Sequence, residues 1–240
     1  MVQVALTLVS AVIPSIYLVW YFDSRDRYPE PRRVLWAVFG LGVCVAIPVV
    51  PIALSFGGML EMIEGPLAFG FASAFLQAAI PEELFKFVVV WFFAARHSAF
   101  DEPMDGVVYG VVASLGFATL ENVLYAWDGG LQLAALRAFT AVPSHAFLGA
   151  IMGFWVSRAK FSGGGRRAIL LALVLPIALH GVYNFPLLAV RRARELSMEI
   201  DPALLTLTIF APLLVATEWF VAVRLTRRLR DGQSRGEGRR

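Results

Sequence analysis

Long apolar runs alternate with short polar segments along most of this chain. Seven runs reach the roughly 20 residues that a helix needs to cross the hydrocarbon core of a bilayer. They cover Gln3–Phe22, Val34–Ser55, Leu67–Ala95, Met104–Trp127, Leu131–Ser157, Arg167–Val190 and Ala203–Arg224. The third run is long enough to tilt, or to break at Pro81, because proline interrupts helical hydrogen bonding. The pattern predicts an all-α bundle of about seven membrane-spanning helices, with eight as the alternative.

The composition strengthens the membrane prediction. Of 240 residues, 58% are apolar and 16% are charged, whereas soluble proteins average about 45–50% apolar and about 25% charged residues. We expect one compact membrane domain whose apolar N-terminus, lacking a small-residue cleavage signal, is retained as a span. The net charge of +3 does not indicate nucleic-acid binding, because the arginines lie at the ends of apolar runs and in the tail. The lone cysteine, Cys44, permits neither an internal disulfide nor a cysteine-based zinc site.

The basic residues predict an orientation. If the N-terminus lies outside, the outer loops carry only Arg191, Arg192 and Arg194. The inner segments then carry Arg25, Arg27, Arg32, Arg33, Arg96, Arg158, Lys160, Arg166, Arg167 and the tail from Arg224. By the positive-inside rule, this imbalance predicts an N-out, C-in protein. We expect a membrane domain over residues 1–226 and a basic, disordered cytoplasmic tail over residues 227–240, close to anionic headgroups.

Charged residues interrupt the third run about halfway along it. Glu82 and Glu83 are followed by Lys86, and each charge at the bilayer centre costs about 2.5–3.5 kcal/mol on insertion scales. Lys86 lies three and four residues after the two glutamates, so it can pair with either on one helical face. A salt bridge that only locks helix packing would explain one carboxylate and the lysine. It would leave the second carboxylate without a partner, which favours a functional role.

Further polar residues occur inside the next three runs. Glu121 and Asn122 lie in the outer part of the fourth run, His145 lies in the fifth, and His180 and Asn184 lie four residues apart in the sixth. A structural alternative exists for each, because a glutamate near a span end can extend to the interface and a lone histidine is often a packing residue. Two histidines on different spans beside three carboxylates are harder to explain by packing.

These polar residues share a depth. In the N-out orientation, and at about 1.5 Å per residue, four of them fall between the middle of the membrane and about 10 Å below its outer surface. They are Glu82, Glu121, His145 and His180. Prolines that free backbone carbonyls precede three of them, at Pro81, Pro143 and Pro176. Such carbonyls are tolerated only when they face protein or water, so the pattern predicts one hydrated polar cluster in the outer half of the bundle.

This set of side chains is suited to hydrolysis. A buried carboxylate can take a proton from water as a general base, and a neutral histidine can polarise a scissile carbonyl or share in the proton transfer. Asn122 and Asn184 are candidates to donate hydrogen bonds to a developing oxyanion. The same glutamates and histidines can instead hold a divalent metal that activates water. The His-Glu-x-x-His helix of zincins is absent, so the residues leave both mechanisms open.

Several short motifs, taken in order, resemble the PrsW family of intramembrane proteases. The motifs are Pro81-Glu82-Glu83-x-x-Lys86, Phe117…Glu121-Asn122, the histidine of the fifth run, and His180…Asn184. The acidic segment from Asp23 to Pro31, which contains Pro29-Glu30-Pro31, resembles the first loop of that family. The resemblance covers the first six runs. The family is similar in turn to the type II CAAX prenyl endopeptidases.

The resemblance implies an activity and a set of site residues. It implies cleavage of single-span, membrane-tethered proteins such as anti-sigma factors, in a site-1 type step at a bacterial cytoplasmic membrane. The catalytic residues would be Glu82, Glu83, Glu121, His145 and His180, supported by Lys86, Asn122 and Asn184. If a divalent metal such as zinc takes part, its ligands would be Glu82, Glu121, His145 and His180.

Two other classes of function use the same residues. Buried carboxylates and histidines are typical of proton- or ion-coupled transporters, but these often show broken helices in two related halves, and no such halves are visible here. A scaffold that binds lipid or a partner helix would explain the arginine clusters, but not the layer of carboxylates and histidines.

Overall fold

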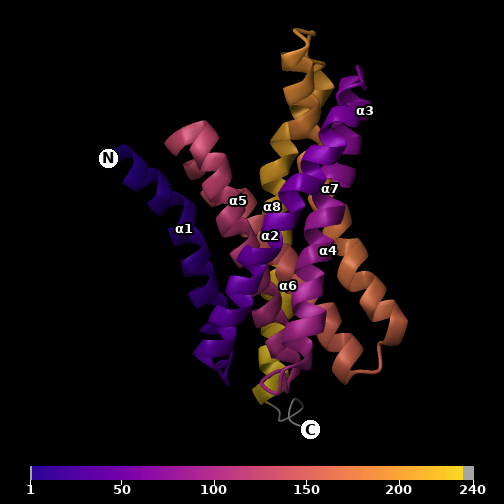
Figure 1. Ribbon diagram of the computed structural model, residues 1–240. Coiled ribbons are helices and arrows are strands. Elements are labelled where there is room, and N and C mark those ends of the chain that lie inside the picture. Colours follow the sequence, from indigo (N-terminus) through magenta and orange to yellow (C-terminus); the bar gives the residue numbers. More distant parts are fainter. Residues whose placement is uncertain (1, 235–240) are drawn as a thin grey trace.

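The computed structural model describes residues 2–234, and in this range every regular element is helical (Figure 1). The prediction of an all-α fold is therefore confirmed. The α-helices are α1 (Val2–Asp23), α2 (Arg32–Leu60), α3 (Pro66–Ala72), α4 (Ile80–Val88), α5 (Pro103–Phe139), α6 (Ala141–Phe161), α7 (Gly165–Glu195) and α8 (Pro202–Ser234). The π-helical segments η1 (Ser73–Ala79) and η2 (Val89–Phe93) and the short 3₁₀ turn η3 (Ala94–Arg96) lie on either side of α4.

Five helical stretches in the described residues are long and apolar enough to cross a membrane. They are Leu6–Asp23, Arg32–Leu60, Pro103–Phe161, Gly165–Glu195 and Pro202–Ser234. The third of these contains both α5 and α6, and the run from Pro66 to Arg96 is divided into shorter segments. The structure thus establishes a polytopic helical bundle, whereas the count of seven spans and the N-out orientation remain predictions.

The third apolar run does not break at Pro81. Its winding widens to a π-helix over Ser73–Ala79 and returns to an α-helix at Ile80, whose N–H bonds to the Phe75 carbonyl. Pro81 is the second residue of α4 and follows the π-helical segment almost directly. A local π-helical adjustment is one way in which a membrane helix accommodates proline. Isolated π-helical turns often occur at functional sites. Here the π-helical turn ends just before the two glutamates of the third run.

Glycine and serine spacing packs α5 tightly against α6. Gly106 and Gly110 on α5 face Gly153 and Gly149 on α6, and a Cβ atom at any of these positions would overlap the backbone of the other helix. Small residues every fourth position let membrane helices approach closely. The two helices meet at Thr140, between Phe139 and Ala141. This close pairing fixes the side chains of α5 and α6 relative to each other.

The turn between α1 and α2, the loop before α5 and the end of α8 meet at one end of the bundle. The amide of Gln233 donates to Asp26 Oδ1 at 2.6 Å and to Glu102. Figure 1 places the α1–α2 turn and the end of α8 at this end. Because α8 continues to Ser234, the predicted division at residue 226 falls inside a helix. The remainder of the predicted tail, residues 235–240, lies outside the described residues.

Candidate active site

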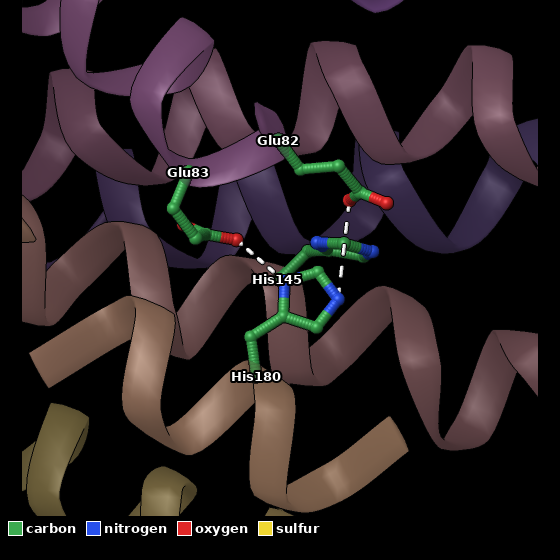
Figure 2. Close-up of side chains that lie close together, drawn as sticks. All are labelled: Glu82, Glu83, His145 and His180. Carbon is green, nitrogen blue, oxygen red and sulfur yellow. Dashed lines mark hydrogen bonds and ion pairs between the residues drawn. The ribbon is translucent and has the colours of Figure 1, made fainter. Parts of the chain in front are cut away.

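The four helices α4, α5, α6 and α7 bring the predicted polar residues together. Helix α4 supplies Glu82, Glu83 and Lys86, and the three neighbouring helices supply the others. We call the following residues the central cluster: Glu82, Glu83, Lys86, Glu121, Arg137, His145 and His180. Figure 2 shows the His180 ring lying between the carboxylates of the two adjacent glutamates.

Lys86 is fully buried and holds one side of the central cluster together. Its ammonium lies 2.7 Å from Glu83 Oε1 and 3.5 Å from Glu82 Oε2. It also lies 2.8 Å from His145 Nδ1 and above the ring of Phe117. The sequence predicted that the lysine could pair with either glutamate; in the structure it pairs with both, and its closer partner is Glu83.

The hydrogen bonds of His145 assign its tautomer. An ammonium can only donate, so Nδ1 of His145 accepts from Lys86. Nε2 then carries the proton and donates to Glu121 Oε2 at 2.9 Å. Both ring nitrogens are therefore occupied, and His145 is held firmly between α4 and α5.

His180 is held on one side only. Its Nδ1 donates to Glu83 Oε1 at 2.8 Å, which leaves Nε2 as the acceptor. Nε2 lies 3.9 Å from Glu82 Oε2, too far for a direct hydrogen bond. A histidine oriented by a carboxylate through one nitrogen, with the other nitrogen free, is the usual arrangement of metal-binding and proton-accepting histidines.

Glu121 is paired rather than extended toward the interface. Arg137 donates to its Oε2 at 2.7 Å and, through Nε, to Asn122 Oδ1 at 3.0 Å. The Asn122 amide donates to the Ala11 carbonyl of α1 at 3.3 Å. Asn122 therefore joins α1 to α5 and is not among the residues that line the cavity described next.

A cavity of about 210 Å³ opens against the central cluster. It is lined by Glu82, Glu121, Arg137, His145 and His180, together with Gln77, Tyr125, Ser144, Tyr183, Asn184 and Arg191. Glu83 and Lys86 lie behind this surface. The volume holds several water molecules, and polar side chains surround it. Glu82 therefore lines the cavity, whereas Glu83 does not and instead contacts Lys86 and His180.

One buried carboxylate near the site was not identified from the sequence. Glu218 on α8 is 1% exposed, and its Oε2 accepts a hydrogen bond from Ser144 at 2.7 Å while Oε1 has no partner. Ser144 lines the cavity beside His145. Glu218 is the only acidic residue within the seventh apolar run, and this isolation was the available signal.

The donor set fits a divalent metal. One ligand atom from each of Glu82, Glu83, His145 and His180 lies within 4.8 Å of the others, and Glu82 Oε2 and Glu83 Oε2 have no hydrogen-bond partner. Mixed histidine and carboxylate ligands suit zinc. The three carboxylates of the central cluster face two basic side chains, which leaves room for added positive charge. Relative to the ligand set expected from the sequence, the structure groups Glu83 rather than Glu121 with the other three residues.

The fold and the site together define the class of this protein. It is a polytopic helical membrane protein with buried glutamates and histidines around a polar cavity. A sequence model described as "PrsW family intramembrane metalloprotease" matches residues 30–217. The chain therefore belongs to the PrsW family of intramembrane metalloproteases. This membership favours the protease over the transporter and scaffold alternatives.

Curated relatives from bacteria support the same conclusion. A protein named "Protease PrsW" from Geobacillus kaustophilus (strain HTA426) is 44% identical over 189 residues, covering 78% of this chain and 82% of the relative. Its namesake in Bacillus subtilis (strain 168) is 39% identical over 183 residues, or 75% of this chain and 82% of the relative. The namesake in Clostridioides difficile (strain 630) is 30% identical over 186 residues, or 74% and 77%. No solved structure matches the chain significantly.

Proposed function

We propose that this protein is an endopeptidase that hydrolyses a peptide bond of a membrane-tethered protein, with Glu82 as the general base. The observation that carries the proposal is the position of Glu82. It lines the cavity, and its Oε2 has no hydrogen-bond partner. A base must reach the proton that it abstracts, and Glu82 is the α4 glutamate on the cavity surface.

Glu82 and His180 form the reacting pair in this proposal. Their 3.9 Å separation suits a water molecule that donates one hydrogen to Glu82 and the other to His180 Nε2. Glu82 takes a proton as the water attacks the scissile carbonyl, and then gives it to the leaving amine. Proton transfer by a positioned side chain contributes about 10²–10⁴-fold to rate.

The remaining members of the central cluster hold this pair in place. Glu83 orients His180 through Nδ1, and Lys86 holds Glu83 and His145. Glu121, paired with Arg137, fixes His145 from the other side. Glu83, Glu121, His145 and Lys86 are thus positioning residues in the proposal.

Asn184 is proposed as the oxyanion donor, and a divalent metal provides an alternative way to activate water. Asn184 lines the cavity and is the oxyanion donor that we propose, whereas Asn122 is bound to α1 and Arg137. In the metal-dependent alternative, Glu82, Glu83, His145 and His180 would hold a divalent metal such as zinc, which would act as a Lewis acid that lowers the pKa of bound water. His145 would then exchange one of its present hydrogen bonds for the metal, and Glu82 would be a ligand instead of the general base.

The substrate that we propose is a single-span membrane protein such as an anti-sigma factor, cut near the outer surface in an N-out protein.

Two arginines line the cavity, and one of them, Arg191, also pairs with Glu195 near the end of α7. The other, Arg137, pairs with Glu121.

Reconstitution tests this function. The purified protein would be placed in lipid vesicles with a panel of single-span substrates, and cleavage by the wild type compared with Glu82→Gln, Glu83→Gln, His145→Ala and His180→Ala. Glu64→Gln is the matched control, because Glu64 is exposed and lies outside the site. We expect cleavage by the wild type and the control only. Full cleavage by all four site variants would refute the site assignment.

Metal dependence is tested separately. Elemental analysis of the purified protein, followed by chelation and re-addition of zinc, distinguishes the two hydrolytic mechanisms. Loss of cleavage on chelation with recovery on zinc addition supports the metal-dependent form. Cleavage by a protein shown to be free of metal supports the form in which Glu82 alone activates water.

A further inference from the structure

A second buried polar cluster, made of carboxylates, lies at the end of the bundle where the α1–α2 turn meets α5 and α8. Asp26 and Glu30 come from the turn, and Asp105 comes from the first turn of α5. One oxygen from each lies within 4.8 Å of the others. We call these three residues the acidic cluster. Each is at most 6% exposed, so water does little to screen their mutual repulsion.

Each aspartate of the acidic cluster uses one oxygen for the protein and leaves the other free. The backbone N–H groups of Asp101 and Glu102 donate to Asp105 Oδ2, both at 2.7 Å. The backbone N–H of Tyr28 donates to Asp26 Oδ1 at 3.0 Å, and Gln233 donates to the same oxygen. The opposite oxygens, Asp26 Oδ2 and Asp105 Oδ1, are buried without a hydrogen-bond partner.

Other contacts hold the acidic cluster in place without giving it a basic partner. The Tyr109 hydroxyl donates to Glu30 Oε2. Among the described residues, none of the three carboxylates forms an ion pair with a basic side chain. The nearby ammonium of Lys160 instead donates to the carbonyls of Ala95 and Phe100, at 2.7 and 2.6 Å.

The electrostatics of the surrounding loops agree with an unmet need for positive charge. Glu102, a neighbour of the acidic cluster, is also buried. A free oxygen of Glu102, Oε2, is buried without a partner as well. Carboxylates arranged in this way gain from a cation that is small, multiply charged and bound through oxygen.

We propose that the acidic cluster binds one hard divalent cation, Ca²⁺ or Mg²⁺, through Asp26, Glu30 and Asp105. The three ligand oxygens lie within 4.8 Å of one another. This bound is compatible with one Ca²⁺ at about 2.3–2.6 Å from each oxygen, and a shorter spacing would suit Mg²⁺ at about 2.0–2.1 Å. The donor set contains oxygen only, unlike the histidine-containing central cluster. The bound ion would fasten the α1–α2 turn to the start of α5, beside the end of α8.

Thermal unfolding and ion binding test this site on the full chain in detergent. After chelation, the protein would be titrated with CaCl₂ or MgCl₂, and bound Ca²⁺ counted by equilibrium dialysis. At about 100 times the Kd, a single bound ion is expected to raise the Tm by roughly 8 °C. We expect Asp105→Asn and Glu30→Gln to lose this shift while keeping their fold, because each amide retains an oxygen for the hydrogen bonds that the carboxylate now accepts.

Two controls separate this site from the central cluster. His180→Ala should keep the full response to Ca²⁺ and Mg²⁺, and so should the exposed variant Glu64→Gln. A shift with only one of the two ions would support the proposal and assign the size of the site. No shift with either ion in the wild type, or an unchanged shift in both Asp105→Asn and Glu30→Gln, would overturn it.

Discussion

Two groups of buried carboxylates lie along α5, and they differ in what neutralises them. Glu121 of the central cluster follows Asp105 of the acidic cluster by sixteen residues, or about 24 Å along the helix axis. In the central cluster, Lys86 and Arg137 pair with the glutamates. In the acidic cluster, hydrogen-bond donors hold one oxygen of each aspartate and no basic side chain pairs with the carboxylates among the described residues.

The difference shows that buried charge in this protein is handled in two ways. Lys86 and Arg137 stabilise the central carboxylates, while the Glu82 side chain still lines the cavity and its Oε2 has no hydrogen-bond partner. In our proposal, the positive partner of the acidic cluster is a divalent cation from solution. The stability of that end of the bundle then depends on the concentration of this cation. Removing a basic partner from the central cluster should therefore lower the Tm, whereas adding a basic partner to the acidic cluster should raise it.

The largest effect is expected from removing the free carboxylate of the central cluster. Glu82→Gln keeps the size of the side chain but removes the base, so cleavage of a reconstituted substrate should fall by about 10²–10⁴-fold. The Tm should change little, because Glu82 lies 3.5 Å from Lys86 and is the weaker of its two carboxylate partners. A variant that cleaves at the wild-type rate would exclude Glu82 as the base.

Removing the internal cation should destabilise the fold. Lys86→Met leaves Glu83 buried without its closest partner, and breaking a buried pair in this way costs about 3–5 kcal/mol. A large fall in Tm in detergent is expected, and the double variant Lys86→Met, Glu83→Gln should recover much of it. If the double variant is no more stable than the single one, the lysine acts through packing and not through charge.

A change between the two clusters should disturb both. Gly110→Val places a branched side chain against the backbone of Gly149, and overpacking of this kind costs about 1–3 kcal/mol. Both the Tm and the rate of substrate cleavage should fall, because α6 carries His145. The control is Gly40→Ala, where an added Cβ meets no atom within 4 Å. Equal behaviour of the two variants would mean that the α5–α6 contact is not limiting.

The smallest effect is expected from giving the acidic cluster a basic residue of its own. The Gln233 amide already contacts Asp26 and Glu102, so Gln233→Lys would place an ammonium beside them. We expect the chelated protein to gain about 1 kcal/mol, or roughly 3 °C in Tm, and its response to Ca²⁺ to shrink. Gln233→Met is the uncharged control, and a gain of the same size in that variant would assign the effect to packing.

The sequence predicted much of the central cluster because local spacing determines it. Glu83 and Lys86 lie three residues apart on one helix, and their pairing follows from that spacing. The histidines stand out because polar groups in apolar runs are costly. The roles within the cluster did not follow from spacing, because which glutamate faces the cavity depends on how α4 is rotated against α5 and α7.

Other features depend on contacts that no local pattern encodes. Asn122 turns toward the Ala11 carbonyl, more than a hundred residues away in the chain, and so leaves the cavity to Asn184. Gln233 reaches Asp26 across 207 positions. The basic residues predicted a disordered tail from residue 227, whereas α8 extends to Ser234 and carries this contact.

The π-helical segment η1 has a consequence for how this family of sequences can vary. Each residue of an α-helix turns the chain by about 100°, and a π-helix turns it by less, so the same sequence wound as an unbroken α-helix would present α4 in a different rotation about its axis. Glu82 would then leave the cavity, although every residue of its motif would still be present. The winding of η1 therefore helps to determine which glutamate of α4 faces the cavity. A homologue can keep every residue of the motif and still differ in this geometry if its η1 segment is wound differently.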